Sequence, residues 1–308
     1  MAKFKGHAPG YFSRVILSLS MRLEFEGGGL RDPGLPHWKN ELTISQPDLV
    51  VLVHGFNNNQ EEAEVAYLGF RDRQAELLQT NSQRFEDTLT DVFWPGDADW
   101  GFLDRLDALC YPKAVGVAKT SAPILADYLM SRTDVLNLYF IGHSMGCRVV
   151  LETIEILRSR GHQTPIRKVC LMAAAVPTHE ICPGGQLSKA FEVPERLRVL
   201  FSPADLVLQY AFPLGESAGG DGLLPVAVGR YGDVPMSPGK IDRDWIPSAG
   251  HSDYWGWNNS KESKIAAQEI ADFLSFGAQP NSLRSRPVAP ARPEAPKRNL
   301  ALRDIGYP

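Results

Sequence analysis

Apolar runs alternate along the chain with segments in which apolar side chains recur at helical spacing. Residues 49–53 are continuously apolar and rich in valine, which is typical of a strand covered on both faces, as in a parallel sheet. The segment that follows has three asparagines, two acids and then Ala63, Tyr67 and Phe70 at helical spacing. This pattern predicts a unit of strand, short loop and helix.

The same unit recurs further along the chain. "DVFWPG" precedes a helical region from about 106 to 132, which we expect Pro123 to kink or divide, and "LNLYFIG" precedes a helix over 144–160 closed by Gly161. "IRKVCLMAAAVP" and "LRVLFSPAD" add two buried strands, and "KESKIAAQEIADFLSF" a final amphipathic helix. The inner stripe of that helix comprises Ile265, Ile270, Phe273 and Leu274. Strands that alternate with helices predict an α/β fold with a mostly parallel, doubly wound sheet.

The two ends of the chain differ from this pattern. Residues 17–25 alternate apolar and polar side chains, which predicts an antiparallel strand with one face in water, within an N-terminal hairpin at 10–45. The core covers 45–276, and we expect one domain over 1–278. Residues 279–308 are rich in proline and arginine, and we expect a disordered or loosely docked tail.

Composition narrows the classes of function. The 308 residues are 44% hydrophobic, and the net charge of -4 offers no basic surface for nucleic acid. No run of about 18 apolar residues and no signal-peptide pattern occurs, so we expect a cytoplasmic protein without a membrane span. The four cysteines form no C-x-x-C pair and are expected to be reduced, mostly buried thiols. Metalloprotease, P-loop and dinucleotide-binding motifs do not occur in the sequence.

One short motif carries a chemical signal. In "FIGHSMGCRVV" Ser144 stands between Gly142 and Gly146, directly after a buried strand and at the start of a helix. This is the G-x-S-x-G pattern in its strand, turn and helix context, where a tight turn forces the serine into a strained backbone conformation and raises its hydroxyl toward solvent. We expect Ser144 to be a nucleophile.

A serine nucleophile needs a base, and His251 is the best candidate. It lies in the loop "IPSAGHSDYWGW" shortly before the last helix, where a side chain can lean toward the serine. The other histidines lie in irregular, strand-end or remote positions, or lack an aspartate between them and the serine. They are His7, His37, His54, His143, His162 and His179.

The acid that orients the base is expected to be Asp205. It follows the strand "LRVLF", where a carboxylate can be held rigidly enough to fix the imidazole tautomer. Four rivals fall in a glycine-rich stretch that shows no strand to hold them, and a fifth is very near the histidine in sequence. They are Asp221, Asp233, Asp242, Asp244 and Asp253.

Two backbone amides are expected to stabilise the oxyanion. They are the N–H of Met145, directly after the nucleophile, and the N–H of Phe56, in the loop after "VLVHG". The asparagines 57–59 serve either to cap the following helix or, with Asn57 first, to place an amide in the substrate pocket. Of the aromatic residues after strand ends, Trp94 and Tyr210 are candidates to line that pocket, and Trp100 and Phe102 accompany them.

Together these residues resemble the α/β-hydrolase fold in the chain order serine, acid, histidine. "VLVHGFNNN", "VFWPG" and "GHSMG" look most like a branch of that superfamily whose substrates are largely uncharacterised, although the loop after His54 is not of the HGGG type. The resemblance implies a serine-hydrolase mechanism. We expect hydrolysis of a small to medium carboxylic ester through an acyl-serine, without metal or organic cofactor.

Other functions remain open at this point. The same triad serves amidases, thioesterases and acyltransferases, and a binding protein can keep the fold without turnover. The 45 residues between Asp205 and His251 contain "GESAGGDGLLPVAVGRYGD", which we expect to form a flexible cover over the site.

Overall fold

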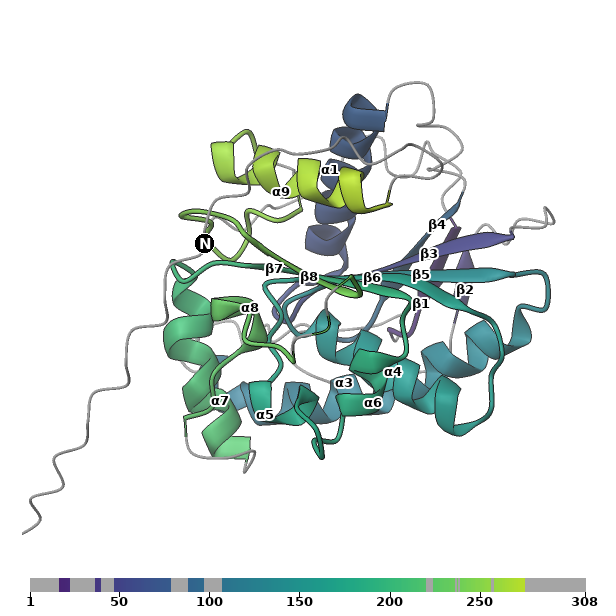
Figure 1. Ribbon diagram of the computed structural model, residues 1–308, viewed down its shortest axis with the longest axis horizontal. Coiled ribbons are helices and arrows are strands. Elements are labelled where there is room, and N and C mark those ends of the chain that lie inside the picture. Colours follow the sequence, from purple (N-terminus) through teal and green to yellow (C-terminus); the bar gives the residue numbers. More distant parts are fainter. Residues whose placement is uncertain are drawn as a thin grey trace, which may run out of the picture.

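The apolar runs of the sequence form one eight-stranded sheet (Figure 1). The computed structural model describes residues 17–22, 37–39, 47–78, 88–96, 107–219, 224–235, 237, 239–255 and 258–274. The strands are β1 (Leu17–Ser20), β2 (His37–Lys39), β3 (Asp48–Val53), β4 (Leu89–Phe93), β5 (Asn137–His143), β6 (Ile166–Met172), β7 (Arg196–Phe201) and β8 (Ile241–Trp245). Their order across the sheet is β2-β1-β4-β3-β5-β6-β7-β8. β2 is antiparallel to β1, and all the other pairs are parallel.

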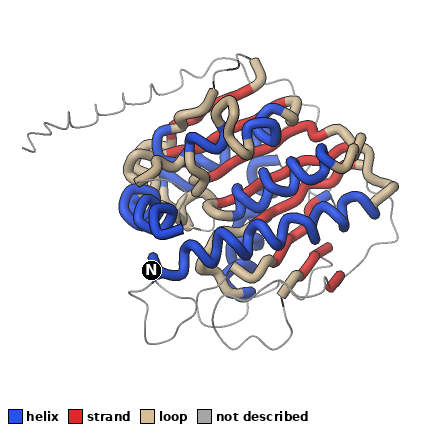
Figure 2. Tube along the Cα trace, turned by 90° about the horizontal axis from the view of Figure 1, so that it is seen from below, coloured by secondary structure: helices blue, strands red, loops and turns tan. Residues whose placement is uncertain are grey.

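Helices cover both faces of this sheet. They are α1 (Gln60–Leu78), α3 (Asp107–Ser131), α4 (Gly146–Ser159), α5 (Thr178–Ile181), α6 (Ser188–Glu192), the π-helical turn η3 (Val207–Ala211), α7 (Phe212–Gly219), α8 (Val228–Tyr231) and α9 (Lys261–Leu274). α1 and α9 lie on one face, and α3, α4 and α6 lie on the other (Figure 1). Figure 2 shows this second layer of helices in front of the strands. Residues 49–53 of β3 are fully buried between the layers, as the sequence predicts. This is the α/β-hydrolase fold.

The first strand differs from its prediction. β1 pairs antiparallel with β2, as the sequence predicts, but on its other side it pairs parallel with β4, so it is an inner strand of the sheet. The expected wet face is wrong for Ser18, which is buried. Residues 1–16 and 275–308, including the expected tail at 279–308, lie outside the described residues.

Three of the long helices can be compared with their sequence predictions. α3 continues through Pro112 and Pro123, so the expected division of this helix at Pro123 does not occur. α4 ends at Ser159, and Gly161 adopts the left-handed conformation with φ 75° that typically closes a helix. The inner stripe of α9 is confirmed, since Ile270, Phe273 and Leu274 are buried and Ile265 packs against them.

β8 is a strand that the sequence reasoning missed. Asp242 and Asp244 lie on it, so the expectation that no strand holds these two carboxylates is wrong. Both carboxylates face arginines of β7, with Arg198 Nε 3.0 Å from Asp244 and Arg196 Nη2 2.6 Å from Asp242. The short, charged sequence of β8 is typical of an edge strand.

The segment between β7 and β8 is more structured than a flexible cover. It contains η3, α7 and α8, while residues 220–223 lie outside the described part. α7 packs against α3, and α8 packs against β7. The segment expected to be a flexible cover therefore contains helices that pack against the rest of the fold.

Candidate functional site

Ser144 lies in the turn that joins β5 to α4. Its backbone has φ 53°, the left-handed region that side-chain-bearing residues rarely adopt. The turn is tight on its α4 side, because a Cβ atom added to Gly146 would lie 2.3 Å from the carbonyl oxygen of His54. Glycine is required at that position, since any side chain would push β3 and α4 apart.

The structure brings Ser144, His251 and Asp205 together. Ser144 Oγ lies 2.8 Å from His251 Nε2, and His251 Nδ1 lies 2.7 Å from Asp205 Oδ2. Because a carboxylate only accepts hydrogen bonds, Nδ1 carries the proton and Nε2 is left to accept from the serine hydroxyl. Asp205 is fully buried, whereas the His251 side chain keeps 11% of its surface exposed. The three residues thus form a continuous chain of hydrogen bonds from Ser144 to Asp205.

The loop after β7 fixes the Asp205 carboxylate. Its Oδ1 accepts the backbone N–H of Leu208 at 3.1 Å, and its own N–H donates to Ser202. Asp253, the rival nearest to His251, has a different task. It accepts the N–H of Gly250 through Oδ2 and the side chains of Asn258 and Ser260 through Oδ1, so it shapes the loop that carries His251.

His143 also holds the loop that carries His251, through a contact that the sequence reasoning missed. Its Nε2–H donates to the backbone carbonyl of His251 at 2.7 Å, and the two rings lie 5.0 Å apart. Burial, and then the charge of His251, lowers the pKa of His143 to about 3, so its ring is neutral near pH 7. The position of His143 directly before the serine is a sequence signal, but its partner is 108 residues away.

The amides of Met145 and Phe56, the expected oxyanion donors, belong to the two segments that meet at Ser144. Gly55 places its loop against the nucleophile, because a Cβ atom there would lie 2.9 Å from Ser144 Cβ. Within the described residues, neither the Met145 N–H nor the Phe56 N–H donates to a backbone carbonyl. Both donors are therefore available to an anion formed beside Ser144.

The loop over 55–59 is held from several directions. The backbone N–H of Asn57 donates to the Gly96 carbonyl at 2.6 Å, and Asn57 itself has φ 60°. Asn59 caps α1, since its side chain accepts the N–H of Glu62 while the Glu62 carboxylate accepts the N–H of Asn59. A role of the Asn57 side chain in substrate binding stays a prediction.

Trp94 is not a pocket residue. It has no exposed surface, its indole N–H donates to the His54 carbonyl at 2.8 Å, and its ring stacks on His54. The prediction that Trp94 lines the substrate pocket is wrong, because the turn after β4 folds the indole into the core. Burial lowers the pKa of His54 to about 3, which fits a neutral structural histidine. Trp100 and Phe102 lie outside the described residues.

A buried ionic cluster of Arg148, Glu180 and Glu216 lies at the start of α4, near Ser144. Arg148, one turn into α4, has no exposed surface and contacts Glu180 at 3.1 Å and Glu216 at 3.3 Å. Although burial lowers the pKa of Arg148, the charges of Glu180 and Glu216 outweigh it and raise that pKa. Tyr111 OH donates to Glu216 at 3.2 Å. The cluster ties α5 and α7 to the helix that begins at the nucleophile.

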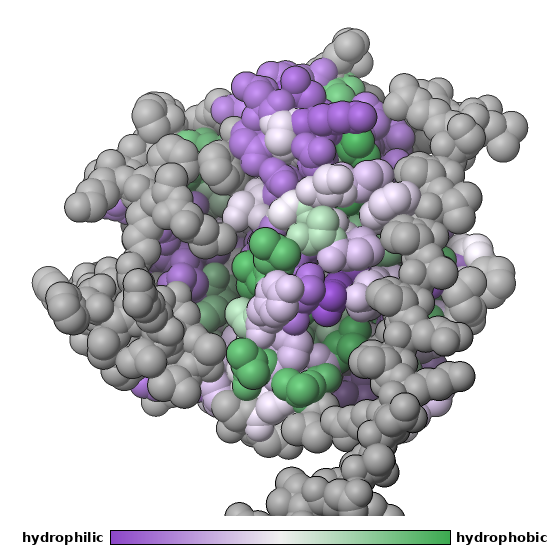
Figure 3. Space-filling view, turned by 90° about the vertical axis from the view of Figure 1, so that its left-hand side faces the viewer, coloured by the Kyte–Doolittle hydropathy of each residue, from purple (hydrophilic) through white to green (hydrophobic). Residues whose placement is uncertain are grey.

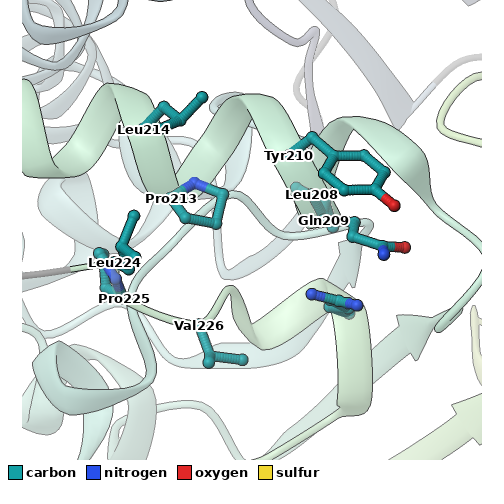
Figure 4. A pocket seen from close by; sticks show the side chains of 9 residues that line it. Leu208, Gln209, Tyr210, Pro213, Leu214, Leu224, Pro225 and Val226 are labelled. Carbon is teal, nitrogen blue, oxygen red and sulfur yellow. The ribbon is translucent and has the colours of Figure 1, made fainter.

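A pocket of about 350 Å³ opens between the η3 and α7 segment and the chain leading into α8. Figure 4 shows Tyr210 and Leu214 on the helical side, across from Val226 on the other. Tyr210 is 61% exposed and lines this pocket. Its part in substrate binding stays a prediction. Figure 3 shows the side of the molecule that lies on the left in Figure 1. Apolar and hydrophilic side chains are interspersed on this face.

Other classes of site have little support in the described part of the chain. No group of three or more His, Cys, Asp or Glu side chains there is arranged to hold a metal ion. Cys147 and Cys170 are free and buried, and burial raises the pKa of Cys170 to about 12. Among the helices of the described residues, none combines the length and the hydropathy that crossing a bilayer requires.

Several solved structures share features of this fold at low identity. A predicted CIB-like hydrolase from Thermoplasma acidophilum is 15% identical with a TM-score of 0.39, covering 76% of this chain and 88% of its own. Est1E from Butyrivibrio proteoclasticus, solved with ferulic acid, is 14% identical with a TM-score of 0.40, covering 74% and 89%. An esterase from Pyrobaculum calidifontis is 15% identical with a TM-score of 0.39, covering 80% and 76%. These likenesses are too distant to bear on the reaction.

The family assignment comes from the sequence itself. No curated protein sequence matches the chain. Residues 37–230 match a family described as "Alpha/beta hydrolase of unknown function (DUF900)", a span that includes Ser144 and Asp205 and ends before His251. Because this match covers more than half of the 308 residues, the chain belongs to that family of α/β hydrolases.

Proposed function

We propose that this hydrolase cleaves small to medium carboxylic esters through an acyl-serine intermediate. The observation that carries the proposal is the hydrogen-bonded chain from Ser144 through His251 to the buried Asp205, with Ser144 held at φ 53°. A serine hydroxyl is a weak nucleophile until a neighbouring base accepts its proton. The two distances of 2.8 and 2.7 Å are within the range that such proton transfer needs.

The proposed reaction has two halves. In the first, Ser144 Oγ attacks the ester carbonyl while its proton passes to His251 Nε2, and the N–H groups of Met145 and Phe56 hold the resulting oxyanion. The protonated imidazole then gives its proton to the departing alcohol, leaving an acyl-serine. In the second half, water repeats the attack with His251 as base, which releases the carboxylic acid and restores the serine.

Asp205 acts through the base in this scheme. Its buried carboxylate keeps the Nδ1 proton in place and stabilises the imidazolium that forms when His251 takes the serine proton. His143 has a positioning role, since its Nε2–H holds the carbonyl of His251 and so helps to fix the height of the imidazole above Ser144. Both roles follow from the same requirement that Nε2 stay aimed at Oγ.

Turnover of matched substrates tests the proposal. The wild type should hydrolyse p-nitrophenyl acetate and butyrate faster than the corresponding thioesters and anilides, and Ser144→Ala and His251→Ala should reduce the rate to background. Ser159→Ala, an exposed serine at the far end of α4, should leave it unchanged. A wild type that turns over anilides or thioesters faster than oxygen esters would move the assignment to amide or thioester cleavage. A folded wild type inactive on all three would contradict hydrolysis by this triad.

A further inference from the structure

The pocket between η3, α7 and the chain leading into α8 combines an apolar wall with one cation. Leu208, Tyr210, Pro213 and Leu214 line its helical side, and Val226 lies opposite. Tyr210, Leu214 and the neighbouring Leu224 are more than half exposed, so a sizeable apolar surface meets water here. Exposed apolar surface grouped around a hollow is typical of a binding site.

Arg230 supplies the cation at this pocket. Its Nε is buried, and within the described part of the chain it has no hydrogen-bond partner. No ion pair joins Arg230 to a carboxylate among the described residues, whereas Arg148 and Arg198 each contact at least two. The guanidinium lies over the ring of Tyr231, with Cζ 4.8 Å from the ring centroid. Stacking on one face leaves the N–H groups at the edge of the guanidinium free to bind a carboxylate.

The walls of the pocket are bonded to the Ser144 site. Leu208 donates its backbone N–H to Asp205 Oδ1, the carboxylate that orients His251. On the other side, the Gly229 N–H donates to Ala174, and the Ala175 N–H donates to the carbonyl of Ser144. Through these hydrogen bonds the Cα atoms of Arg230 and Ser144 are at most about 20 Å apart. Pocket and serine therefore lie at the same edge of the sheet.

Leu224 adds a further observation at the rim. Its backbone has φ 49°, which is strained for a leucine, and its N–H donates to Ser217 Oγ at 2.7 Å. The bond ties the rim of the pocket to α7. The same residue keeps half of its surface in water, where an apolar side chain gains free energy if a ligand covers it.

We infer that this pocket binds an apolar chain that ends in a carboxylate, with the carboxylate on Arg230 and the chain against Tyr210 and Leu214. The inference rests on the proposed function, and it narrows the substrate class to esters that carry a second, anionic end. Arg230 is partly buried at the apolar pocket and has no ion pair among the described residues, so its guanidinium can take a carboxylate of the ligand as its partner. A neutral chain fills the pocket but leaves the guanidinium without its anion.

Paired substrates separate this inference from the proposed function. We would compare p-nitrophenyl octanoate with the p-nitrophenyl monoester of octanedioic acid, which differ at the far end of the chain. The wild type should favour the anionic ester in kcat/KM, and Arg230→Gln should lower that preference at least 10-fold while its rate on the neutral ester stays near wild type. Arg230→Lys should keep part of the preference. Arg158→Gln, an exposed arginine near the end of α4, should keep all of it.

Binding to an inactive variant makes the test independent of turnover. In Ser144→Ala, the monomethyl ester of octanedioic acid should bind more tightly than methyl octanoate by calorimetry, and adding Arg230→Gln should remove the difference. Equal binding of the two esters, or a difference that survives Arg230→Gln, would overturn the inference. Loss of turnover on both substrates with the binding difference intact would instead contradict the proposed function and leave the anion site standing.

Discussion

Replacing Arg148 by methionine would remove a buried cation that contacts two buried carboxylates. Arg148 has no exposed surface, and Glu180 and Glu216 are 3% and 1% exposed. Its Nη2 is 3.1 Å from Glu180 and 3.3 Å from Glu216, so one buried cation contacts both carboxylates. Removing one partner of a buried ion pair typically destabilises a protein by about 3–5 kcal/mol. That is a large share of the roughly 5–15 kcal/mol by which native proteins are stable.

Urea unfolding measures this effect. We expect Arg148→Met to lose about 3–5 kcal/mol of unfolding free energy at pH 8, because methionine fills the space but brings no charge. Adding Glu180→Gln and Glu216→Gln should recover at least half of the loss, since the two buried negative charges that Arg148 contacts are then gone. Arg158→Met, an exposed position on the same helix, should stay within about 0.5 kcal/mol of wild type. A loss under 1 kcal/mol, or a triple variant no more stable than the single one, would refute the reasoning.

Three further outcomes follow from the site. Asp205→Asn should lower kcat on esters about 10⁴-fold with KM and circular dichroism unchanged, as in other triads, and near wild-type turnover would reassign the acid. His143→Leu should lower kcat about 10–100-fold, with partial rescue by His143→Gln, which keeps an N–H donor for His251; equal rates in the two variants would exclude the positioning role. Because His54 and His143 have pKa values of about 3, below the unfolded 6.5, urea unfolding should show full stability above pH 6.5 and a loss of roughly 2 kcal/mol each by pH 5; no such loss would contradict their neutral burial.

The regular part of the fold was predictable because its signals are local. Continuous apolar runs are found only where a strand is covered on both faces, and β3, β5, β6 and β7 all show such runs. β8 was missed because three consecutive charged residues, 242–244, look like loop sequence. Its partners on β7 are also distant in the sequence, with Arg196 46 residues before Asp242. Trp94 was misassigned for a related reason. An aromatic residue at a strand end has the same local sequence whether it faces a pocket or the core.

In the candidate site, too, residues with a local sequence signal could be predicted, whereas contacts between distant segments could not. Ser144 and Asp205 could be proposed because each follows a buried strand, and His251 because it precedes the last helix. The contacts made by His143 and Arg148 could not be proposed, since their partners come from loops and helices that only tertiary packing brings near. Arg230 is similar. Its lack of a counter-ion within the described residues is visible only once the neighbours of its side chain are known.

Covalent labelling of the folded protein tests the nucleophile most directly. A fluorophosphonate reacts with a serine hydroxyl only where a base activates it, so the labelled peptide, mapped by mass spectrometry, identifies the reacting residue. We expect one label on Ser144 in the wild type, none in Ser144→Ala, and strongly reduced labelling in His251→Ala. A folded wild type that takes up no label, or that is labelled at another serine, would contradict the assignment of Ser144 as the activated nucleophile.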